Sequence, residues 1–423
     1  MAGAAARAAG QREPSRRSRA AGADVRPAAR AAAPPLEHRV LLTATLCLLA
    51  FGAVMVYSAS TPRGLVAGQG SGLSYLIRYL AAGLLGLAAL RVLARRGLAL
   101  LNPGIVKLML LGSFALLALV LVPGIGIDIL GARRWFGAGP IQFQPSEVMK
   151  LAIVLYVARF LAEHPKRIKS FQQTIVPVGI VAVPACLLIV VEPDLGTTLV
   201  VAFVLGALLV AAGVPMRHLA ILAALGVGCV LVIAVAQPYA RTRLTAFLHP
   251  SAAPSASSAA YQALQGQIAI GSGGVFGVGI GEGVQKAFYL PEAQTDTILA
   301  VIGEELGVLG IFALVGLYAM MAWSGFRIAR RASTRYGKLL ASGLTSLIMC
   351  QATLNIFVVV GLAPLTGVPL PFISYAPTNL CIMLASVGLL LNISVPKAPR
   401  LKVVASAPDA AEERERRRRH RRT

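Results

Sequence analysis

Two carboxylates in the segment YLPEAQTD, residues 289–296, have the spacing of an acid–base pair. Glu292 and Asp296 are four residues apart, so they share one face if a helix begins early in this segment. Two carboxylates at close range raise at least one pKa, and a partly desolvated carboxylate is then a competent general base. We therefore expect catalytic chemistry at Asp296 and Glu292.

A second segment carries basic residues that suit an anionic ligand. Arg133 and Arg134 precede Trp135, and Gln144 precedes a helix start in which Lys150 lies one turn further in. If this segment lies outside a membrane, two arginines on the disfavoured side need a reason, and a lipid pyrophosphate would supply one. The residues leave open an alternative in which the segment only anchors and caps a helix at the interface.

Two further segments join apolar stretches. In PDLGT, residues 193–197, Asp194 either caps a helix that begins near Gly196 or contacts a metal or a substrate hydroxyl. Ser374 lies in a proline-broken segment, 361–379, and such breaks are tolerated only where protein or a watery cavity satisfies the backbone. A cavity is therefore expected beside Ser374.

The glycine-rich run at 271–283 resembles a nucleotide-binding turn only superficially. No strand pattern precedes it, and no Gly-Lys-Ser/Thr follows it. A flexible re-entrant or surface segment that approaches a lipid head group fits this run better.

The elements that position these residues are membrane spans. With 57% hydrophobic residues, 13% charged residues and a mean hydropathy of +0.73, the composition lies far from that of soluble domains. We predict an all-α integral membrane protein with about ten transmembrane helices of roughly 20 residues each. The predicted spans lie near 40–60, 77–94, 104–123, 146–163, 174–191, 196–213, 218–236, 298–324, 339–363 and 372–394.

The distribution of Lys and Arg predicts the orientation of the chain. With a cytoplasmic amino terminus, the inner connections hold about twice as many basic residues as the outer ones. Both termini are therefore predicted to be cytoplasmic. The long connection at 237–297, between the seventh and eighth helices, is then extracytoplasmic.

The net charge of +23 would suggest a nucleic-acid partner if the basic residues formed one patch on a soluble domain. Instead, nearly half of the excess lies in two polar tails, 1–39 and 397–423, which flank a membrane domain at 40–396. We expect disordered basic cytoplasmic tails near anionic membrane lipid and no nucleic-acid partner.

The chain resembles the SEDS family of bacterial peptidoglycan glycosyltransferases, which includes FtsW, RodA and SpoVE. The resemblance rests on GARRW at 131–135, FQPSE at 143–147, PDLGT at 193–197, IAIGSGG at 268–274, LPEAQTD at 290–296, IGEELG at 302–307 and PLPFISY at 369–375. These motifs occur in the order of the family. GVQKAFYLPEA and IGEELG are most similar to the FtsW branch.

The resemblance implies polymerisation of lipid II at the outer face of the bacterial cytoplasmic membrane, with loss of undecaprenyl pyrophosphate. It also implies a class B penicillin-binding protein and other division proteins as partners, at the septum. The catalytic aspartate of the family corresponds to Asp296, and its functional basic residues correspond to Arg133, Arg134 and Lys150. Together with the segments above, the candidate substrate-binding residues are Arg133, Arg134, Trp135, Gln144, Lys150, Asp194, Arg243, Lys286 and Ser374.

A departing pyrophosphate needs positive charge to stabilise it, and we expect these basic residues to supply it. A divalent cation, Mg²⁺ or Mn²⁺, is a further candidate. The residues themselves predict no metal site. The sequence departs from the family pattern at Gln294, at Thr297 and at Ala376-Pro-Thr-Asn379. Two alternatives therefore stay open, a lipid II flippase or other transporter and a catalytically impaired division scaffold.

Overall fold

The computed structural model describes residues 34–66, 72–129, 132–138, 141–249, 259–395 and 419–420. Most of both predicted tails, and the serine-rich stretch at 251–258, lie outside the described residues. The helices are α1 (Leu36–Val66), α2 (Leu73–Leu100), α3 (Pro103–Val120), α4 (Pro145–Glu163), α5 (Val176–Val191), α6 (Leu195–Ala212), α7 (Met216–Ala236), α8 (Pro238–Leu248), α9 (Ala259–Gly273), α10 (Gln285–Phe288), α11 (Ile298–Arg331), α12 (Arg335–Val360) and α13 (Pro377–Ser394).

Within the described residues, nine helices are long and apolar enough to cross a membrane. They are α1, α2, α3, α5 with the π-helical turn η2 (Phe171–Ile175) before it, α6, α7, α11, α12 and α13. The remaining predicted span, 146–163, corresponds to α4, which has 19 residues but carries Glu147, Lys150 and Arg159. The predicted all-α membrane fold is confirmed.

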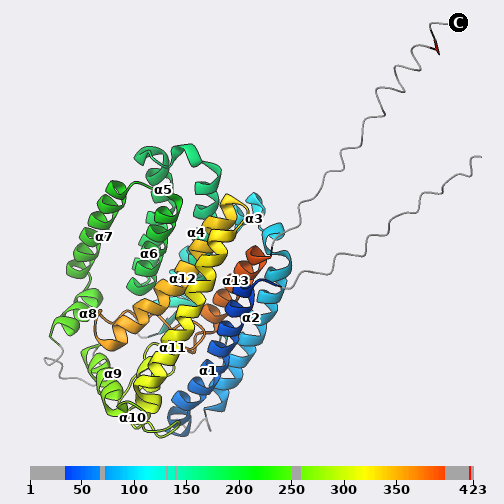
Figure 1. Cartoon of the computed structure of the whole chain (residues 1–423). Helices are drawn as coiled ribbons and strands as arrows, with labels where there is room; N and C mark the ends of the chain where they lie inside the picture. Colours follow the sequence, from blue (N-terminus) through cyan, green and yellow to red (C-terminus); the bar gives the residue numbers. More distant parts are fainter. Residues whose placement is uncertain are drawn as a thin grey trace, which may run out of the picture. The chain divides into compact units, whose positions relative to one another are not determined.

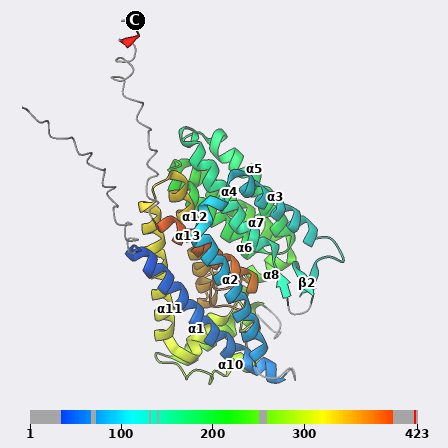
Figure 2. The ribbon, with the colours of Figure 1, turned by 90° about the vertical axis from the view of Figure 1, so that its right-hand side faces the viewer.

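The helices form two groups with α12 between them (Figures 1 and 2). One group contains α5, α6 and α7, and the other contains α1, α2 and α13. The helix α4 packs against α3, α6 and α12, and α2 runs along α13. Because α4 is enclosed by other helices over much of its length, Glu147 and Lys150 are buried and have protein rather than lipid as their surroundings.

Local sequence sets the ends of the helices nearest the candidate residues. Asp194 caps α6, since its Oδ1 accepts a hydrogen bond from the amide of Thr197 at 3.0 Å. The helix ends at Gly213, whose φ of 87° is costly for residues with a side chain. The capping role predicted for Asp194 is therefore confirmed.

A small sheet, which the sequence reading did not anticipate, precedes α4. Strands β1 (Ile127–Ile129), β2 (Ala132–Ala138) and β3 (Ile141–Phe143) pair in antiparallel order, with Arg133 opposite Asp128 and Phe136 opposite Phe143. Pairing within the segment satisfies backbone groups that neighbouring lipid could not. The sheet thereby presents Arg133, Arg134 and Trp135 on a rigid element.

One boundary differs from the prediction. The first helix begins at Leu36, inside the range assigned to the amino-terminal tail, because Glu37 is buried and pairs with Arg327 and Arg331 of α11. The connection at 237–297 contains α8, α9 and α10, and α9 packs along α11.

The helix α11 is broken at Gly307, whose φ and ψ are 66° and −165°. The preceding loop completes the interrupted hydrogen bonding. Val278 and Gly279 donate their amides to the carbonyls of Glu304 and Glu305, each at 3.0 Å. The amides of Val308 and Leu309 donate to the carbonyls of Gly274 and Val275, at 3.0 and 3.2 Å. The glycine-rich run is thus an integral part of the α11 structure.

Candidate functional site

Two arginines from different elements meet at one tyrosine. Arg134 of β2 donates from Nη2 to the hydroxyl of Tyr239 at 3.2 Å, and the Arg243 guanidinium carbon lies 4.3 Å from the centre of the Tyr239 ring. Tyr239 and Arg243 are four residues apart on α8, so they share a helix face. We call Arg134, Tyr239, Arg243 and the nearby Asp296 the arginine cluster.

The hydrogen bonds of both arginines go to neutral acceptors. Arg134 donates from Nε to the carbonyl of Glu192 at 2.8 Å and from Nη2 to the carbonyl of Pro193. Arg243 donates from Nη1 to the carbonyl of Leu365 at 2.8 Å. A carbonyl holds a guanidinium in place without forming an ion pair, although the nearby carboxylates of Asp194 and Asp296 offset part of the positive charge.

Asp296 lies beside this pair of cations. A Cβ atom on Gly367 would lie 3.3 Å from Asp296 Oδ2 and 3.7 Å from Arg243 Nη1, so the Gly367 turn borders both groups. The φ of 73° at Gly367 also favours glycine. Burial, followed by the charge of Glu292, raises the pKa of Asp296 to about 6, although Arg243 and Arg134 act in the opposite direction.

Glu292 lies near Asp296 for a different reason from the one predicted. The shared helix face is wrong, since α11 begins only at Ile298 and residues 291–297 form turns. Thr295 donates from Oγ1 to Glu292 Oε2 at 3.2 Å, and Thr297 donates to the Glu292 carbonyl at 3.1 Å. These bonds fold the segment so that the Glu292 charge still acts on Asp296.

Three of the predicted residues form hydrogen bonds in segments next to the arginine cluster. They are Ser374, Gln144 and Asp194. Ser374 is buried, donates to the carbonyl of Thr295 at 2.6 Å and accepts from the amide of Leu370 at 2.8 Å. Gln144 donates from Nε2 to Asp194 Oδ2 at 3.2 Å. All three predicted residues therefore hold the segments that carry Asp296 and Arg134.

The structure does not bring Lys150 and Lys286 to the arginine cluster. The Lys150 ammonium bonds to Glu147 Oε1 and Gln351 Oε1, both at 2.8 Å, and the Lys150 side chain is 1% exposed. The Lys286 ammonium bonds to Glu305, and its side chain is 3% exposed. We call Lys150–Glu147 and Lys286–Glu305 the lysine pairs. Each ammonium is neutralised by a buried carboxylate, so neither is placed to meet an anionic ligand.

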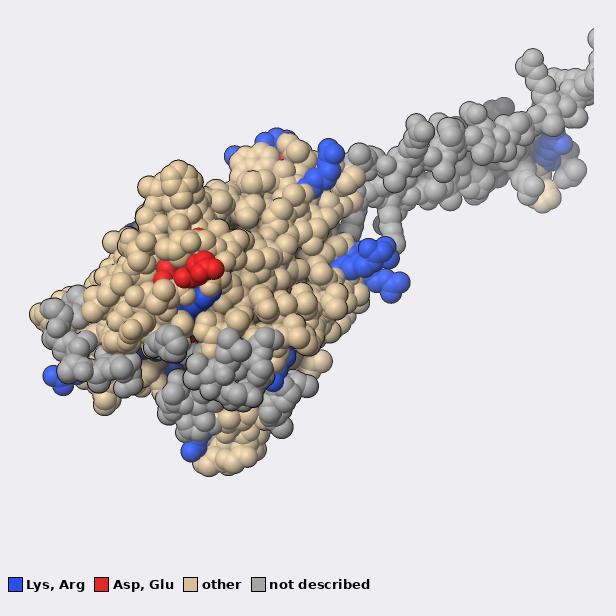
Figure 3. All heavy atoms as spheres, turned by 90° about the horizontal axis from the view of Figure 1, so that it is seen from below, with Lys and Arg blue, Asp and Glu red and all other residues tan. Residues whose placement is uncertain are grey.

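Arg133 and Trp135 flank Arg134 on β2, and both are half-buried. The Arg134 guanidinium carbon lies 5.9 Å from the centre of the Trp135 ring. The surface at the α9–α10 end is mostly uncharged, and one group of acidic atoms lies beside basic atoms near its middle (Figure 3).

Several residues of the site were assigned no specific role from the sequence. Tyr239 organises the two arginines, and Asn355 donates to the carbonyls of Asp296 and Val368. Glu192 is fully buried, and burial, followed by the charge of Asp194, raises its pKa to about 9. A polar residue such as Asn355 within an apolar span is the one signal that could have been used.

The described residues contain no group of three or more His, Cys, Asp or Glu side chains that could hold a metal ion. Asp296 and Glu292 supply two carboxylates, and one or two carboxylates together with substrate phosphates are the usual ligands of Mg²⁺ in such sites. The divalent cation therefore stays a prediction, and the steps proposed below use the side chains of the protein.

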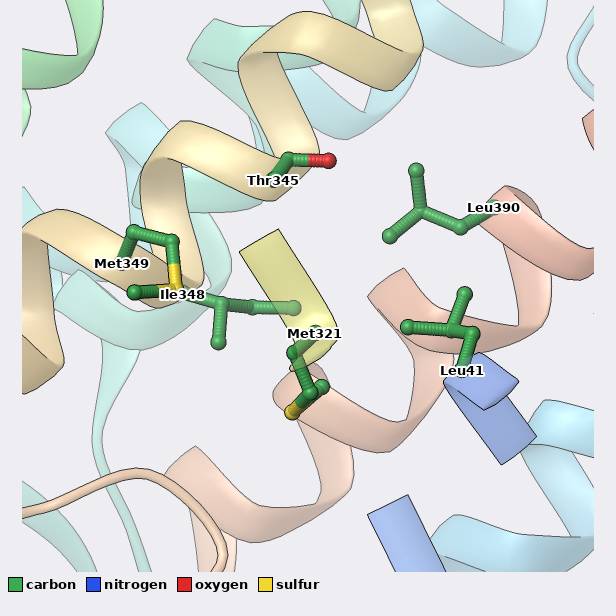
Figure 4. Close-up of a pocket in the computed structure, with 6 residues that line it drawn as sticks. All are labelled: Leu41, Met321, Thr345, Ile348, Met349 and Leu390. Carbon is green, nitrogen blue, oxygen red and sulfur yellow. The ribbon is translucent and has the colours of Figure 1, made fainter. Parts of the chain in front are cut away.

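A separate small pocket lies between α1, α11, α12 and α13 (Figure 4). Thr345 is its one polar lining residue, and its hydroxyl donates to the carbonyl of Ala341 at 2.8 Å. The other lining residues are Leu41, Met321, Ile348, Met349 and Leu390. Apart from Thr345, this pocket offers no polar partner to a sugar or a phosphate.

Residues 39–398 match the family described as "Cell cycle protein", which groups FtsW, RodA and SpoVE. The chain is 42% identical over 288 residues to stage V sporulation protein E of Bacillus subtilis, covering 68% of this chain and 78% of that protein. It is 38% identical over 357 residues to the probable peptidoglycan glycosyltransferase FtsW of Trichlorobacter lovleyi, covering 84% and 92%.

Solved structures agree with these relatives. One, titled "Structural coordination of polymerization and crosslinking by a peptidoglycan synthase complex", matches with a TM-score of 0.67 and 29% identity, over 84% of this chain and 96% of that one. The rod shape determining protein RodA of Thermus thermophilus matches with a TM-score of 0.60 and 29% identity, over 84% and 95%. The resemblance carried by the motifs is therefore confirmed, and this multi-pass membrane protein belongs to the FtsW/RodA/SpoVE family, in its FtsW branch.

Proposed function

We propose that this chain is a peptidoglycan glycosyltransferase that polymerises lipid II into glycan strands during cell division. One observation carries the proposal. A carboxylate with a raised pKa, Asp296, lies across the Gly367 turn from Arg243, and Tyr239 joins Arg243 to Arg134. A base and two cations at one place suit attack by a sugar hydroxyl on a pyrophosphate-linked donor.

The reaction is an inverting transfer. Asp296 removes the proton of the acceptor's 4-hydroxyl, whose oxygen bonds to the donor's anomeric carbon on the face opposite the pyrophosphate. The bond to undecaprenyl pyrophosphate breaks, and the pyrophosphate leaves with the bonding electrons and needs no proton. The negative charge that develops there is stabilised by Arg134 and Arg243, with Arg133 and Trp135 on the same strand as further contacts.

The other candidate residues have supporting roles in this proposal. The charge of Glu292 keeps the pKa of Asp296 high enough for a base. Gln144, Asp194 and Ser374 hold the segments that carry Arg134 and Asp296. Lys150 and Lys286 take no part in binding the pyrophosphate, because each is paired with a buried carboxylate.

We further propose that the reaction takes place at the outer face of the cytoplasmic membrane at the septum, with both termini cytoplasmic. The excess of Lys and Arg in the predicted inner connections supports this orientation. A class B penicillin-binding protein is the proposed partner, because one similar structure is titled as a complex that coordinates polymerisation and crosslinking.

The deciding experiment uses the purified full chain in liposomes, with its transpeptidase partner and labelled lipid II. We expect glycan polymer that contains inverted linkages. Movement of lipid II across the bilayer without polymer would replace the proposal by a flippase. If neither polymer nor translocation is observed, the division scaffold remains as the function.

A further inference from the structure

Asn355 on α12 joins two parts of the arginine cluster that are distant in sequence. Its Nδ2 donates hydrogen bonds to the carbonyls of Asp296 and Val368, both at 2.8 Å, and the residue is 2% exposed. Carbonyl oxygens only accept hydrogen bonds, so these two partners fix which end of the amide faces them. A carboxylate or a methyl group at this position could not make either bond.

The first of these bonds fixes the backbone of Asp296. The amide of Ala300 donates to the carbonyl of Thr297 at 2.9 Å, so the hydrogen bonding of α11 begins one residue after Asp296. The Asp296 carbonyl instead finds its donor in Asn355. A side chain of α12 therefore holds the peptide that carries the carboxylate.

The second bond fixes the turn on the opposite side of Asp296. Val368 follows Gly367, which borders both Asp296 Oδ2 and Arg243 Nη1. Two residues before Gly367, the carbonyl of Leu365 accepts from Arg243. One buried amide thus ties the base to the turn that holds a cation.

We propose that Asn355 is a positioning residue that sets the geometry between the Asp296 carboxylate and the Arg243 guanidinium. This inference rests on the proposed function, since it assigns Asn355 a role in that same site. Asn355 acts through the two carbonyls that it binds and needs no contact with the substrate. A displacement of about 1 Å at a reacting group is enough to lower a rate by about 10²-fold.

A second effect on Asp296 follows from its surroundings. The groups that act on its pKa are Glu292 and Asp194, which raise it, and Arg243 and Arg134, which lower it, in addition to burial, which has the largest influence. If the Asn355 bond is lost, the Asp296 backbone is less constrained, and we expect the half-buried carboxylate to gain further access to water. Its pKa then falls towards the ordinary value, and the low-pH limit of activity moves to lower pH.

The test compares Asn355→Ala with Asn392→Ala, a matched loss of a buried amide far from the site. Asn392 of α13 is 7% exposed, donates to the carbonyl of Ala94 at 2.7 Å and accepts from the amide of Leu98 at 3.2 Å, both on α2. For Asn355→Ala we expect kcat to fall by about 10- to 100-fold with little change in KM, and the low-pH limit to shift downwards. Asn392→Ala lowers the melting temperature similarly and leaves both kinetic readouts near those of the unaltered protein.

Hydrogen–deuterium exchange of residues 290–300 provides a readout that does not depend on activity. We expect faster exchange there in Asn355→Ala and in the isosteric Asn355→Asp, and no change in Asn392→Ala. Unchanged exchange, or equal losses of kcat in the Asn355→Ala and Asn392→Ala proteins, would overturn the positioning role. If the unaltered protein makes no polymer, the proposed function fails, while the exchange measurement still decides whether Asn355 holds the Asp296 segment.

Discussion

The arginine cluster and the lysine pairs use their cations in opposite ways. Arg134 and Arg243 donate to carbonyl oxygens, which orient the guanidiniums and leave their charge in place. Lys150 and Lys286 donate to the carboxylates of Glu147 and Glu305, so each pair is close to neutral. The partner of a cation therefore distinguishes a site for an anion from a buried structural ion pair.

The two arrangements also differ in how the free-energy cost of removing a cation from water is offset. In a buried ion pair, the attraction between the two charges offsets much of the free-energy cost of desolvation. Removing one partner leaves an unpaired buried charge. A guanidinium held by carbonyls keeps unsatisfied electrostatic potential, which an anionic ligand then satisfies. The following predictions test this contrast, from the largest expected effect to the smallest.

Asp296→Asn is expected to have the largest effect on catalysis. Replacing the base by a neutral amide of the same size should lower glycan polymerisation by about 10²- to 10⁴-fold, while the fold and membrane insertion stay intact. The matched control is Glu163→Gln, an exposed carboxylate at the far end of α4 that pairs with Arg159. Polymer yields that are equal in the two variants would remove Asp296 from the reaction.

Lys286→Met is expected to lower stability rather than to act on chemistry. It leaves the buried carboxylate of Glu305 without its partner, and this costs about 3–5 kcal/mol in the free energy of unfolding. The double variant Lys286→Met with Glu305→Gln should recover most of that loss and retain polymerisation. Denaturation in detergent measures the first effect and the lipid II assay the second. A stable double variant that makes no polymer would move Lys286 into the binding site.

Arg134→Gln is expected to weaken use of the pyrophosphate-linked donor. The loss of one preorganised cation should reduce kcat/KM by about 10²- to 10³-fold, because Arg134 no longer stabilises the negative charge on the leaving group. Arg159→Gln is the control, since Arg159 also donates to a carbonyl, that of Leu101 at 3.1 Å, but lies at the opposite end of α4 from β2. Similar kinetics for the two variants would indicate that Arg134 only anchors its segment at the membrane interface.

The pH dependence of the unaltered protein should show the raised pKa of Asp296. Its carboxylate is active as a base only when deprotonated, and its pKa is about 6. Activity is therefore expected to be level above pH 7 and to fall about tenfold for each pH unit below 6. A pH profile of kcat measures this limb. A limb near pH 4 would mean that Asp296 works as a solvated carboxylate.

The spans and their order were predictable because lipid imposes a simple rule on the chain. Apolar runs of about 20 residues must become helices, so the predicted spans agree closely with α1–α7 and α11–α13. The strand β2 was missed because a short hairpin has no comparable length or composition signal. The early helix around Glu292 was wrong because bonds from Thr295 and Thr297 favour turns there.

The composition of the site was only partly predictable. The sequence marks Asp296, Arg134 and Arg243 as charged groups near predicted helix ends, and the structure brings these together. The sequence also marks Lys150 and Lys286 as charged groups. Nothing in their local sequence predicts that their ammonium groups donate hydrogen bonds to Gln351 and Ser58 on other helices. Tyr239 was missed for the same reason, because its importance depends on contacts with a strand about a hundred residues away.

The break in α11 has a consequence for biogenesis. Residues 274–279 supply four hydrogen bonds that the helix lacks around Gly307, so neither segment is complete by itself. The ribosome delivers the loop first, so these four backbone groups lack their α11 partners until the helix emerges. We therefore expect docking of the two segments to precede the final settling of α11 in lipid, and mutations in this loop to appear first as slow or failed maturation.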